Sequence, residues 1–444
     1  MYRSAIKLLI ISTLAGVLSF VALTFIYSAQ EKSIIDITGD SKGYMMLAEN
    51  LLDNHVFSVS SEPPFDPESF RSPGYPAFLA LLFGLTNNWF LVLLVQVLLV
   101  SVAPVLLYLL VSPYHERAAW YSSLIFALEP TRLFTSANLL SDALFTCVFL
   151  CSLVLLEYAR RKNTFLPFVG VGVVVGLSIW IRPIAVFLPI VFALYVWWST
   201  SSWKRGIALG FLLIVVAYAA VFPWMLRNHA KFNSLGISSV GSANLMLYNA
   251  PTFATHLKDA EVSKKVADFR AEQTALPRED ALSLARSDRF TDAFRDTISG
   301  HEFAYVLFHV GKTIPFFVTD GLREIARLSG VKGAPSFNIT GALFHGDIGA
   351  IINYFKQGGI SIVLLIIGSC FWALTTLLFF LGAFGSVIEG RNSKFVLFLA
   401  ALVLYFALLT GPVSNARYRL PVSGLMIAIA ATILIKPSMK VEGV

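Results

Sequence analysis

Two aspartates in the first polar segment of the chain could do acid–base chemistry. The segment reads DITGDSKGYMMLAENLL, and it places Asp36 and Asp40 four residues apart. A carboxylate of this kind can act as a general base on an attacking hydroxyl or amine. Tyr44, Leu47 and Leu51 follow at helical spacing, so Asp40 lies near a helix start, where capping is its simpler role. Asp36 could equally be an exposed loop acid, and both interpretations stay open.

Six arginines stand at or near the ends of apolar runs, where a permanent charge is costly. Each guanidinium group offers a planar fork of donors that suits a phosphate. For any single one of them, snorkelling to lipid headgroups is an equally good interpretation. They are Arg71 in FRSPGYP, Arg132 in PTRLF, Arg182 in WIRPI, Arg227 in WMLRN, and Arg417 and Arg419 in NARYRLP.

Two further acids lie close to apolar runs. Glu129 stands three residues before Arg132 and could pair with it. Asp142 follows Leu-Leu-Ser and could cap a helix. Either carboxylate could instead line a cavity. The histidines show no metal-ligand spacing, and the chain has no Walker loop, GxSxG or dinucleotide motif.

The composition is that of a multi-pass membrane protein. Of the 444 residues, 56% are hydrophobic and 14% are charged, whereas soluble domains carry about 25% charged residues. The net charge of +7 is better explained by loop charges that set membrane orientation than by nucleic-acid binding. The three cysteines lie inside apolar runs without disulfide or metal spacing. We therefore expect an all-α polytopic membrane protein with no nucleic-acid partner.

Ten apolar runs are long enough to cross a bilayer. If the N-terminus is cytoplasmic, twelve cations of the loops and tails fall on the cytoplasmic side, as the positive-inside rule favours. We expect an uncleaved first helix and cytoplasmic N- and C-termini. The runs are 5–29, 89–112, 117–137, 139–158, 165–181, 183–199, 206–226, 360–386, 395–411 and 418–436. The cations are Arg3, Lys7, Arg117, Arg160, Arg161, Lys162, Lys204, Arg205, Arg391, Lys394, Lys436 and Lys440.

This topology divides the chain into three parts. Residues 1–226 form a membrane module that contains the first outer loop, 30–88. Residues 227–359 form a mainly helical outer-face domain, and residues 360–444 form a C-terminal membrane module.

Three stretches of the outer-face domain have helical patterns. If the apolar stretch 302–319 crossed the membrane, all later loop cations would lie on the outer side. We therefore expect an interfacial or ectodomain helix there. The stretches 259–274 and 279–298 have the spacing of amphipathic surface helices.

The topology also places all six arginines at the outer face, against the positive-inside rule. A cluster of guanidinium groups at the outer leaflet suits a phosphate whose lipid tail stays in the membrane. A carboxylate facing this cluster could activate an acceptor while the arginines stabilise a departing phosphate.

In four places the sequence resembles the GT-C membrane glycosyltransferases, specifically the protein O-mannosyltransferase and aminoarabinose-transferase branch, family 39. The places are DSKGYMMLAENLL, FRSPGYPAFLALLFGL, LEPTRLFTSANLLSDALF and RYRLP. The resemblance covers most of 1–240 and about 410–425, and 240–360 carries little that matches. Where the mannosyltransferases have adjacent acids, Asp-Glu, this chain has Asp40-Ser41. The resemblance therefore extends to the superfamily rather than to a substrate.

The resemblance implies a bundle of spans under outer-face helices and a donor in which a sugar is joined to a polyprenyl phosphate. By position, Asp40 would be the catalytic base or the acid that orients the acceptor, and Arg71 would hold the donor phosphate. Metal dependence varies within the superfamily, so a divalent cation stays open. Together with the reasoning above, the candidate residues are Asp40 and Asp36 for catalysis; Arg71, Arg417, Arg419, Arg182 and Arg227 for the donor phosphate; and Tyr44, Tyr75, Glu129 and Asp142 for the cavity lining.

We therefore expect an inverting membrane glycosyltransferase of a bacterial inner or plasma membrane. It would move a sugar from a polyprenyl phosphate to an envelope glycan, lipid or protein on the extracytoplasmic face. A transporter or flippase of lipid-linked oligosaccharide would share the outer arginines, but it would not need the acid-Tyr-Ala loop or a large ectodomain. An oligosaccharide polymerase or ligase would also use such arginines, with a whole repeat unit as donor.

Overall fold

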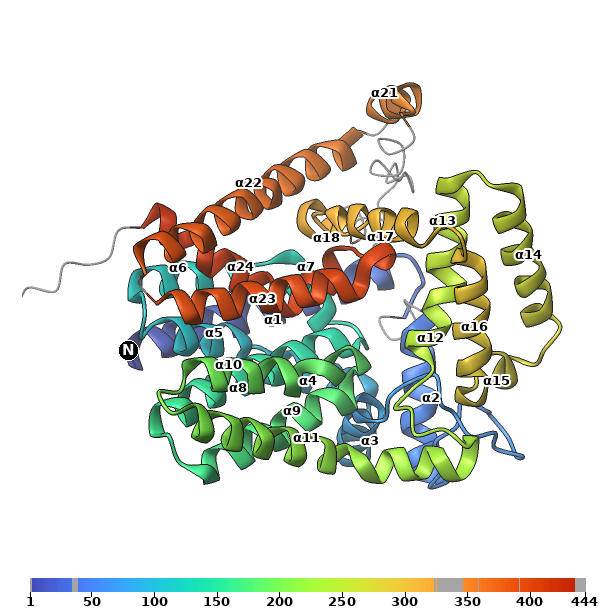
Figure 1. The fold of residues 1–444 in the computed structure, drawn as a ribbon, viewed down its shortest axis with the longest axis horizontal. Coiled ribbons are helices and arrows are strands. Elements are labelled where there is room, and N and C mark those ends of the chain that lie inside the picture. The colour runs from blue at the N-terminus through green and yellow to red at the C-terminus, as the bar shows by residue number, and fades with distance from the viewer. Residues whose placement is uncertain are drawn as a thin grey trace, which may run out of the picture.

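The computed structural model describes residues 2–33, 39–322, 325, 346–357, 359–390 and 392–435, and the regular elements of this part are all helices (Figure 1). The all-α polytopic fold is confirmed. Asp36, Arg391, Lys436 and Lys440 lie outside the described residues.

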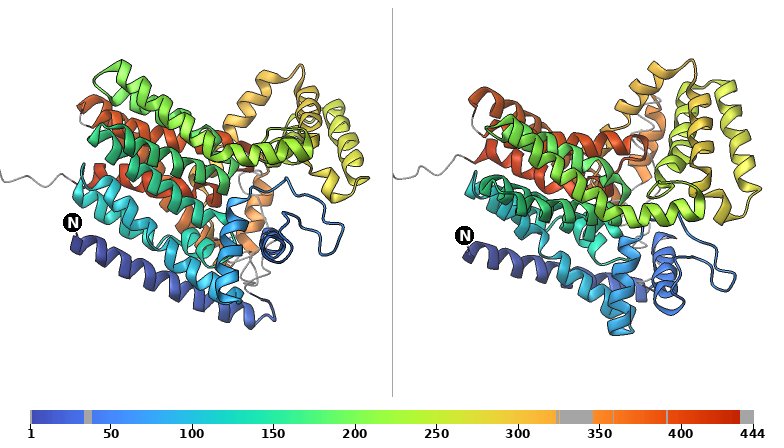
Figure 2. Two further views of the ribbon diagram at one scale, coloured as in Figure 1. Left: turned by 90° about the horizontal axis from the view of Figure 1, so that it is seen from below. Right: turned by 60° about the horizontal axis from the view of Figure 1, so that its bottom comes forward.

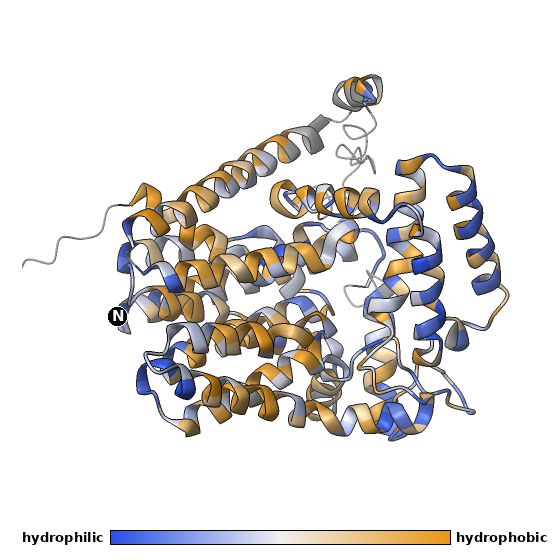
Figure 3. Cartoon of the chain, viewed as in Figure 1, coloured by the Kyte–Doolittle hydropathy of each residue, from blue (hydrophilic) through white to orange (hydrophobic). Residues whose placement is uncertain are grey.

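A bundle of apolar helices makes up most of the molecule (Figure 3). Seven described segments are long and apolar enough to cross a membrane, and the shorter apolar helices Gly74–Thr86, Phe165–Ile181 and Pro183–Ser199 accompany them. The bundle consists of α1 (Tyr2–Ser28), α4 (Trp89–Val100), α5 (Ala103–Val111), α6 (Glu116–Ala127), α7 (Pro130–Ser136), α8 (Ser141–Lys162), α9 (Phe165–Ile181), η1 (Pro183–Phe187), α10 (Leu188–Ser199), α11 (Trp203–Phe232), α22 (Gly359–Glu389), α23 (Ser393–Thr410), η4 (Gly411–Val413) and α24 (Ala416–Leu434).

A second group of helices gathers at the end of the bundle that lies away from the N-terminus (Figure 2). Nearest the bundle are α2 (Gly39–Asp53) and α3 (Gly74–Thr86). Beyond them lies a set that we call the distal domain, residues 240–298, which has its own apolar core around Met246, Phe269 and Phe290. Its elements are α12 (Val240–Asn244), η2 (Leu245–Asn249), α13 (Ala250–Leu257), α14 (Ala260–Thr274), α15 (Arg278–Ala281), η3 (Leu284–Arg286) and α16 (Ser287–Ile298). The chain continues through α17 (Glu302–Gly311), α18 (Ile314–Val318) and α21 (Ile348–Gln357).

The stretch 302–319 consists of two helices rather than one. α17 and α18 are separated at Lys312 and Thr313. At about 1.5 Å per residue, neither helix is long enough to cross a bilayer. Phe303, Leu307 and Val310 on α17 are exposed, and their interfacial position stays a prediction.

The expected span 117–137 is wrong, because this stretch is broken at Glu129-Pro130. α6 ends at Ala127, and α7 begins at Pro130, with Glu129 as the N-cap that accepts a hydrogen bond from Arg132 N at 2.6 Å. Proline suits the first position of a helix and disfavours helical conformation in the residue before it. With 12 residues, α6 is about 18 Å long, which is shorter than the hydrocarbon core of about 30 Å.

Small residues set the spacing between α9 and α11. A Cβ atom on Gly172 would lie 2.7 Å from Val216 Cβ, and one on Gly176 would lie 2.7 Å from Ala220 Cβ. Glycines four residues apart let two membrane helices approach closely, so that van der Waals packing holds them together. This seam fixes α9, whose C-terminal end carries Arg182.

We expect Gly176→Leu to destabilise the protein by roughly 1–3 kcal/mol, because the added side chain overpacks the α9–α11 seam. Thermal unfolding of the purified protein measures the effect as a lower Tm. Gly170→Leu is the control, because a Cβ at Gly170 meets nothing within 4 Å. Equal Tm changes in both variants would mean that the glycine seam does not hold these helices.

Candidate active site

Asp40 lies in the first turn of α2, at the end of the bundle next to the distal domain. Its side chain is 44% exposed. Asp40 Oδ1 accepts from Arg71 Nη2 at 3.3 Å, and Oδ2 accepts from Arg417 Nη1 and Nη2, also at 3.3 Å. Asp40 is therefore a partly open carboxylate held between two guanidinium groups that come from distant parts of the chain.

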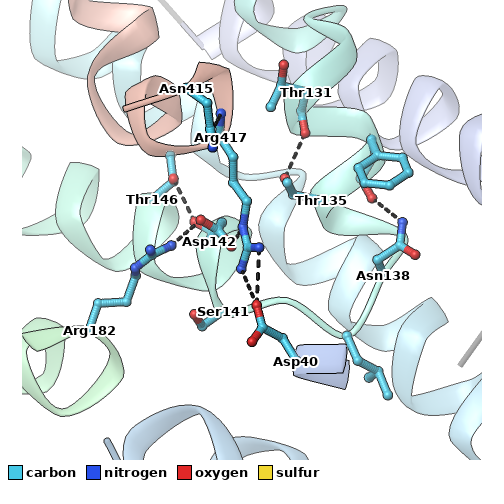
Figure 4. Close-up of polar contacts among 12 residues, drawn as sticks. Asp40, Thr131, Thr135, Asn138, Ser141, Asp142, Thr146, Arg182, Asn415 and Arg417 are labelled. Atoms are coloured by element: carbon cyan, nitrogen blue, oxygen red, sulfur yellow. Dashed lines mark hydrogen bonds and ion pairs between the residues drawn. The ribbon is translucent and has the colours of Figure 1, made fainter. Parts of the chain in front are cut away.

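Asp142 is a second carboxylate of the same group, and it is fully buried in the first turn of α8. One of its oxygens accepts from Arg182 Nη1, and the other accepts from Arg417 Nε at 2.7 Å. Arg417 thus bridges Asp40 and Asp142, with Arg182 on the far side of Asp142 (Figure 4). The negative side chain also lies at a helix N-terminus, where the helix dipole favours it.

Five side chains make up what we call the charge cluster: Asp40, Asp142, Arg71, Arg182 and Arg417. Three guanidinium groups face two carboxylates, so one positive charge is in excess. Little water reaches Arg71 and Asp142, and charges interact more strongly where the effective dielectric constant is low. The cluster is therefore suited to a ligand group with one negative charge.

Arg71 reaches the cluster because the FRSPGYP loop packs against the end of α9. Ser72 Oγ donates to the carbonyl oxygen of Ile181 at 2.9 Å. A Cβ on Gly74 would lie 2.6 Å from the backbone of Trp180. The loop that carries Arg71 is thereby held against the end of α9, where Arg182 follows Ile181 directly.

Tyr44 packs against Arg71, and Tyr75 packs against Tyr44. The Arg71 Cζ atom lies 5.2 Å from the centre of the Tyr44 ring, and the Tyr44 hydroxyl is 3.4 Å from Ser141 Oγ. Tyr75 packs edge-on against Tyr44 and donates to Gln96 Oε1 at 2.7 Å. Burial raises the pKa of Tyr75 well above its usual value, so this phenol stays protonated. Tyr44 therefore borders the charge cluster, and Tyr75 contacts Tyr44 on the side of Gln96.

Gly43 and Tyr418 are not among the predicted site residues, although both contact arginines of the cluster. A Cβ on Gly43 would lie 2.6 Å from Arg71 Nη1, so a larger residue would displace the guanidinium group from its place against α2. A glycine inside a helical pattern is the available signal for such a close approach. The Arg182 Cζ atom lies 5.6 Å from the centre of the Tyr418 ring.

Three predicted site residues lie away from the cluster. Arg419 is buried against Trp372 and donates to the carbonyl oxygens of Phe316 and Thr319, both at 2.6 Å. Because residues two apart on a helix point about 200° apart, Arg417 and Arg419 cannot face the same group.

Arg227 and Glu129 complete this set. The Arg227 guanidinium lies 4.6 Å from the centre of the Trp224 ring and donates to the Glu68 carbonyl oxygen at 2.9 Å. Glu129 caps α7. These contacts indicate packing and capping roles, and the structure does not bring either residue to the cluster.

A cavity of about 380 Å³ adjoins Arg71 on the side of the distal domain. Its walls are α2, Leu282 and the segment 54–73 between α2 and α3, which we call the first loop. The lining residues are Lys42, Gly43, Met46, Val59, Ser60, Asp66, Pro67, Glu68, Ser69, Phe70, Arg71 and Leu282.

The carboxylates of the cluster are poor candidates for metal ligation. In the described part of the chain, no three His, Cys, Asp or Glu side chains gather in a geometry that could hold a metal ion. Both oxygens of Asp142 and both oxygens of Asp40 already accept hydrogen bonds from arginines. Carboxylate oxygens that are already bound to arginines do not fit a divalent cation.

The chain is similar to known proteins in part of its sequence and in its fold. Residues 70–226 match the family profile of dolichyl-phosphate-mannose-protein mannosyltransferases. No curated protein sequence matches the chain. The oligosaccharyltransferase of Archaeoglobus fulgidus has a similar fold, with a TM-score of 0.55 and 14% identity over 96% of this chain and 49% of that one. The arabinosyltransferase EmbB of Mycobacterium smegmatis matches with a TM-score of 0.33 and 11% identity, over 82% of this chain and 41% of that one.

The predicted resemblance to the GT-C membrane glycosyltransferases is confirmed by the family match and the shared fold. The chain spans about half the length of the oligosaccharyltransferase that it matches. The Arg71 loop begins the matched segment, which also contains Asp142 and Arg182.

We expect Asp142→Asn to destabilise the protein by about 3–5 kcal/mol, because it leaves Arg182 and Arg417 as partly buried charges without their shared partner. Asp40→Asn is the comparison, and it should cost about 1 kcal/mol or less because its carboxylate is partly exposed. Thermal unfolding of both variants measures the difference. If Asp40→Asn lowered the Tm more than Asp142→Asn, the assignment of the structural and the exposed carboxylate would be reversed.

Proposed function

We propose that this membrane glycosyltransferase of the GT-C type takes its sugar from a polyprenyl phosphate and that Asp40 is the catalytic base. The observation that carries the proposal is the partly exposed carboxylate of Asp40, which shares Arg417 with the buried Asp142. A catalytic base must be exposed enough to reach the proton that it removes, as Asp40 is. A carboxylate that holds the arginines in position must itself be fixed, as the buried Asp142 is. The two aspartates have the exposure that these two roles require.

The excess charge of the cluster supports a phosphate-linked donor. A sugar joined to a polyprenyl monophosphate is a phosphodiester with one negative charge, which matches the one excess guanidinium charge. Arg182 lies at the end of α9, and Arg417 lies in the first turn of α24. A phosphate bound there would leave its polyprenyl chain free to lie along the exposed apolar side chains of the bundle helices.

The transfer would follow a direct displacement with inversion. Asp40 takes the proton of the acceptor hydroxyl, whose oxygen attacks the anomeric carbon of the donor sugar. The bond between the anomeric carbon and the phosphate oxygen breaks, and polyprenyl phosphate leaves with the electron pair. Arg71, Arg182 and Arg417 stabilise the charge that develops on the leaving phosphate.

Donor binding would also prepare the base. Without donor, the Asp40 oxygens accept hydrogen bonds from Arg71 and Arg417. A phosphate competes for the same guanidinium groups and releases lone pairs of the carboxylate for the acceptor proton. Base activation would therefore follow donor binding. A flippase needs no such exposed carboxylate, so the geometry favours transfer over transport.

We place the cluster on the extracytoplasmic face, with the acceptor an envelope glycan, lipid or protein. Arg160 and Lys162 lie in the last turn of α8, whereas Asp142 lies in its first turn. The loop cations therefore collect at the end of the bundle opposite the cluster, which the positive-inside rule assigns to the cytoplasm. Cytoplasmic termini follow from the same orientation, and a bacterial inner or plasma membrane is part of the proposal.

We expect Asp40→Asn to lower the transfer rate by about 10²–10⁴-fold, because the amide cannot take the acceptor proton. The assay follows label from radiolabelled polyprenyl-phosphate sugars into an envelope acceptor fraction. Asp53→Asn, an exposed position on the same helix, should leave the rate unchanged. Near-normal transfer by a correctly folded Asp40→Asn protein would exclude Asp40 as the base.

We expect Arg71→Ala to weaken donor binding by roughly tenfold to a hundredfold, because a hydrogen bond to a charged group contributes about 1.5–3 kcal/mol. Binding of a polyprenyl-phosphate sugar to the purified protein gives the Kd, and a melting curve gives the Tm. Arg295→Ala serves as the control, because Arg295 lies on the exposed face of α16. A fall in Tm with an unchanged Kd would make Arg71 a structural arginine.

A further inference from the structure

The cavity beside Arg71 is a second space that the transfer chemistry does not use. Its lining comes from α2, the first loop and Leu282 of the distal domain. Arg71 is shared: its guanidinium group contacts Asp40, and its side chain also forms part of the cavity wall. A molecule in this cavity would therefore be one guanidinium group away from the carboxylate proposed as the base.

The wall of the cavity is braced from several directions. Asn50 Nδ2 donates to the carbonyl oxygens of Ser58 and Ser60, at 2.8 and 2.9 Å. Ser69 Oγ accepts from Leu284 N at 2.8 Å, and the Ser69 carbonyl oxygen accepts from Ser239 N at 3.0 Å. The first loop is thus tied both to α2 and to the distal domain. A site whose walls are fixed in advance loses less conformational freedom when it binds a ligand.

The chemistry of the lining is mixed and electrically balanced. Two cations, Lys42 and Arg71, face the same space as two acids, Asp66 and Glu68. Ser60 adds a hydroxyl group, while Met46, Val59, Phe70 and Leu282 add apolar surface. A ligand with many hydroxyl groups and apolar C–H faces suits such walls, because carboxylates accept hydrogen bonds from its hydroxyl groups and the lysine ammonium group donates hydrogen bonds to its oxygens. Because two cations balance two acids, the lining does not favour a ligand with a net charge.

The position of the cavity assigns it to the acceptor rather than to the donor. Arg182 and Arg417 reach the cluster from bundle helices, so the donor and its lipid tail belong on the bundle side. The cavity lies on the other side of Arg71, toward the distal domain. In a direct displacement, the acceptor oxygen and the leaving phosphate lie on opposite sides of the anomeric carbon. An acceptor residue held in the cavity would therefore approach from the side opposite the phosphate, with its attacking hydroxyl group reaching past Arg71 to Asp40.

We infer that the cavity formed by α2, the first loop and Leu282 binds the acceptor, and that the bound acceptor unit is a neutral carbohydrate residue. The inference rests on the proposed function and deepens it by naming the acceptor class. A volume of about 380 Å³ lies in the lower part of the range for small-molecule sites, about 300–1,000 Å³.

The test uses the full-length protein in lipid nanodiscs and a panel of methyl glycosides of common hexoses and N-acetylhexosamines. Saturation-transfer NMR measures their binding. Met46→Trp fills the cavity, and Asp66→Asn removes one carboxylate from its wall. We expect at least one glycoside to bind the unaltered protein, and we expect each substitution to weaken that binding by at least tenfold.

Two controls separate the cavity from its surroundings. Glu62→Gln removes an exposed acid from the same loop, and Leu81→Trp adds a tryptophan at an exposed position on α3. Both variants should bind the glycoside as the unaltered protein does. If no glycoside binds, or if the controls and the cavity variants weaken binding equally, the inference is overturned. Binding of a serine- and threonine-containing peptide that Met46→Trp abolishes would also overturn it, in favour of a protein acceptor.

Transfer kinetics separate this inference from the proposed function. With radiolabelled donor and a binding glycoside as acceptor, Asp66→Asn should raise the acceptor KM by at least tenfold and leave the donor KM unchanged. An unaltered acceptor KM in Asp66→Asn and Met46→Trp would defeat the acceptor assignment alone. Absence of donor-dependent transfer by the unaltered protein would defeat the proposed function, whatever the glycosides do.

Discussion

The bridge formed by Arg417 between Asp40 and Asp142 is the interaction on which the site depends. Asp142 is fully buried at the start of α8, and a carboxylate in that position needs cationic partners to remain charged. Arg417 and Arg182 supply them. Because Arg417 also contacts Asp40, the buried charge pair fixes where the exposed carboxylate can lie. One side chain, Arg417, therefore both compensates the buried charge of Asp142 and positions Asp40, the proposed base.

Close packing, rather than additional ion pairs, positions the helices around the charge cluster. The glycines of the α9–α11 seam hold α9, and the loop before α3 packs on the end of α9 through Ser72 and Gly74. Gly43 then leaves the space that the Arg71 guanidinium occupies against α2. A larger residue at any of these close contacts would move an arginine relative to Asp40. The distal domain adds one wall of the adjoining cavity through Leu282, so the site is completed from both sides.

Much of the fold follows from the sequence, because apolar runs of spanning length have few alternatives to a membrane helix. The helix break at Glu129-Pro130 could also have been predicted from the sequence, since an acid followed by proline is a helix-start signal. The grouping of Arg417 with Arg419 ignored helical geometry, which points the two side chains apart. By contrast, the meeting of Asp142 with Arg182 and Arg417 joins residues far apart along the chain. Hydropathy and local spacing carry no information about such a contact, so Asp142 could be proposed only as a cavity-lining residue.

The central claim is that the charge cluster binds the phosphate of a lipid-linked sugar next to Asp40. A cryo-EM structure of the full-length protein in nanodiscs with a non-hydrolysable polyprenyl-phosphate sugar analogue tests it most directly. We expect the phosphate within hydrogen-bond distance of Arg71 and Arg417, with the Asp40 carboxylate released from at least one guanidinium group and facing the anomeric carbon. A phosphate bound at the opposite end of the bundle, with the contacts of Asp40 unchanged, would contradict the claim.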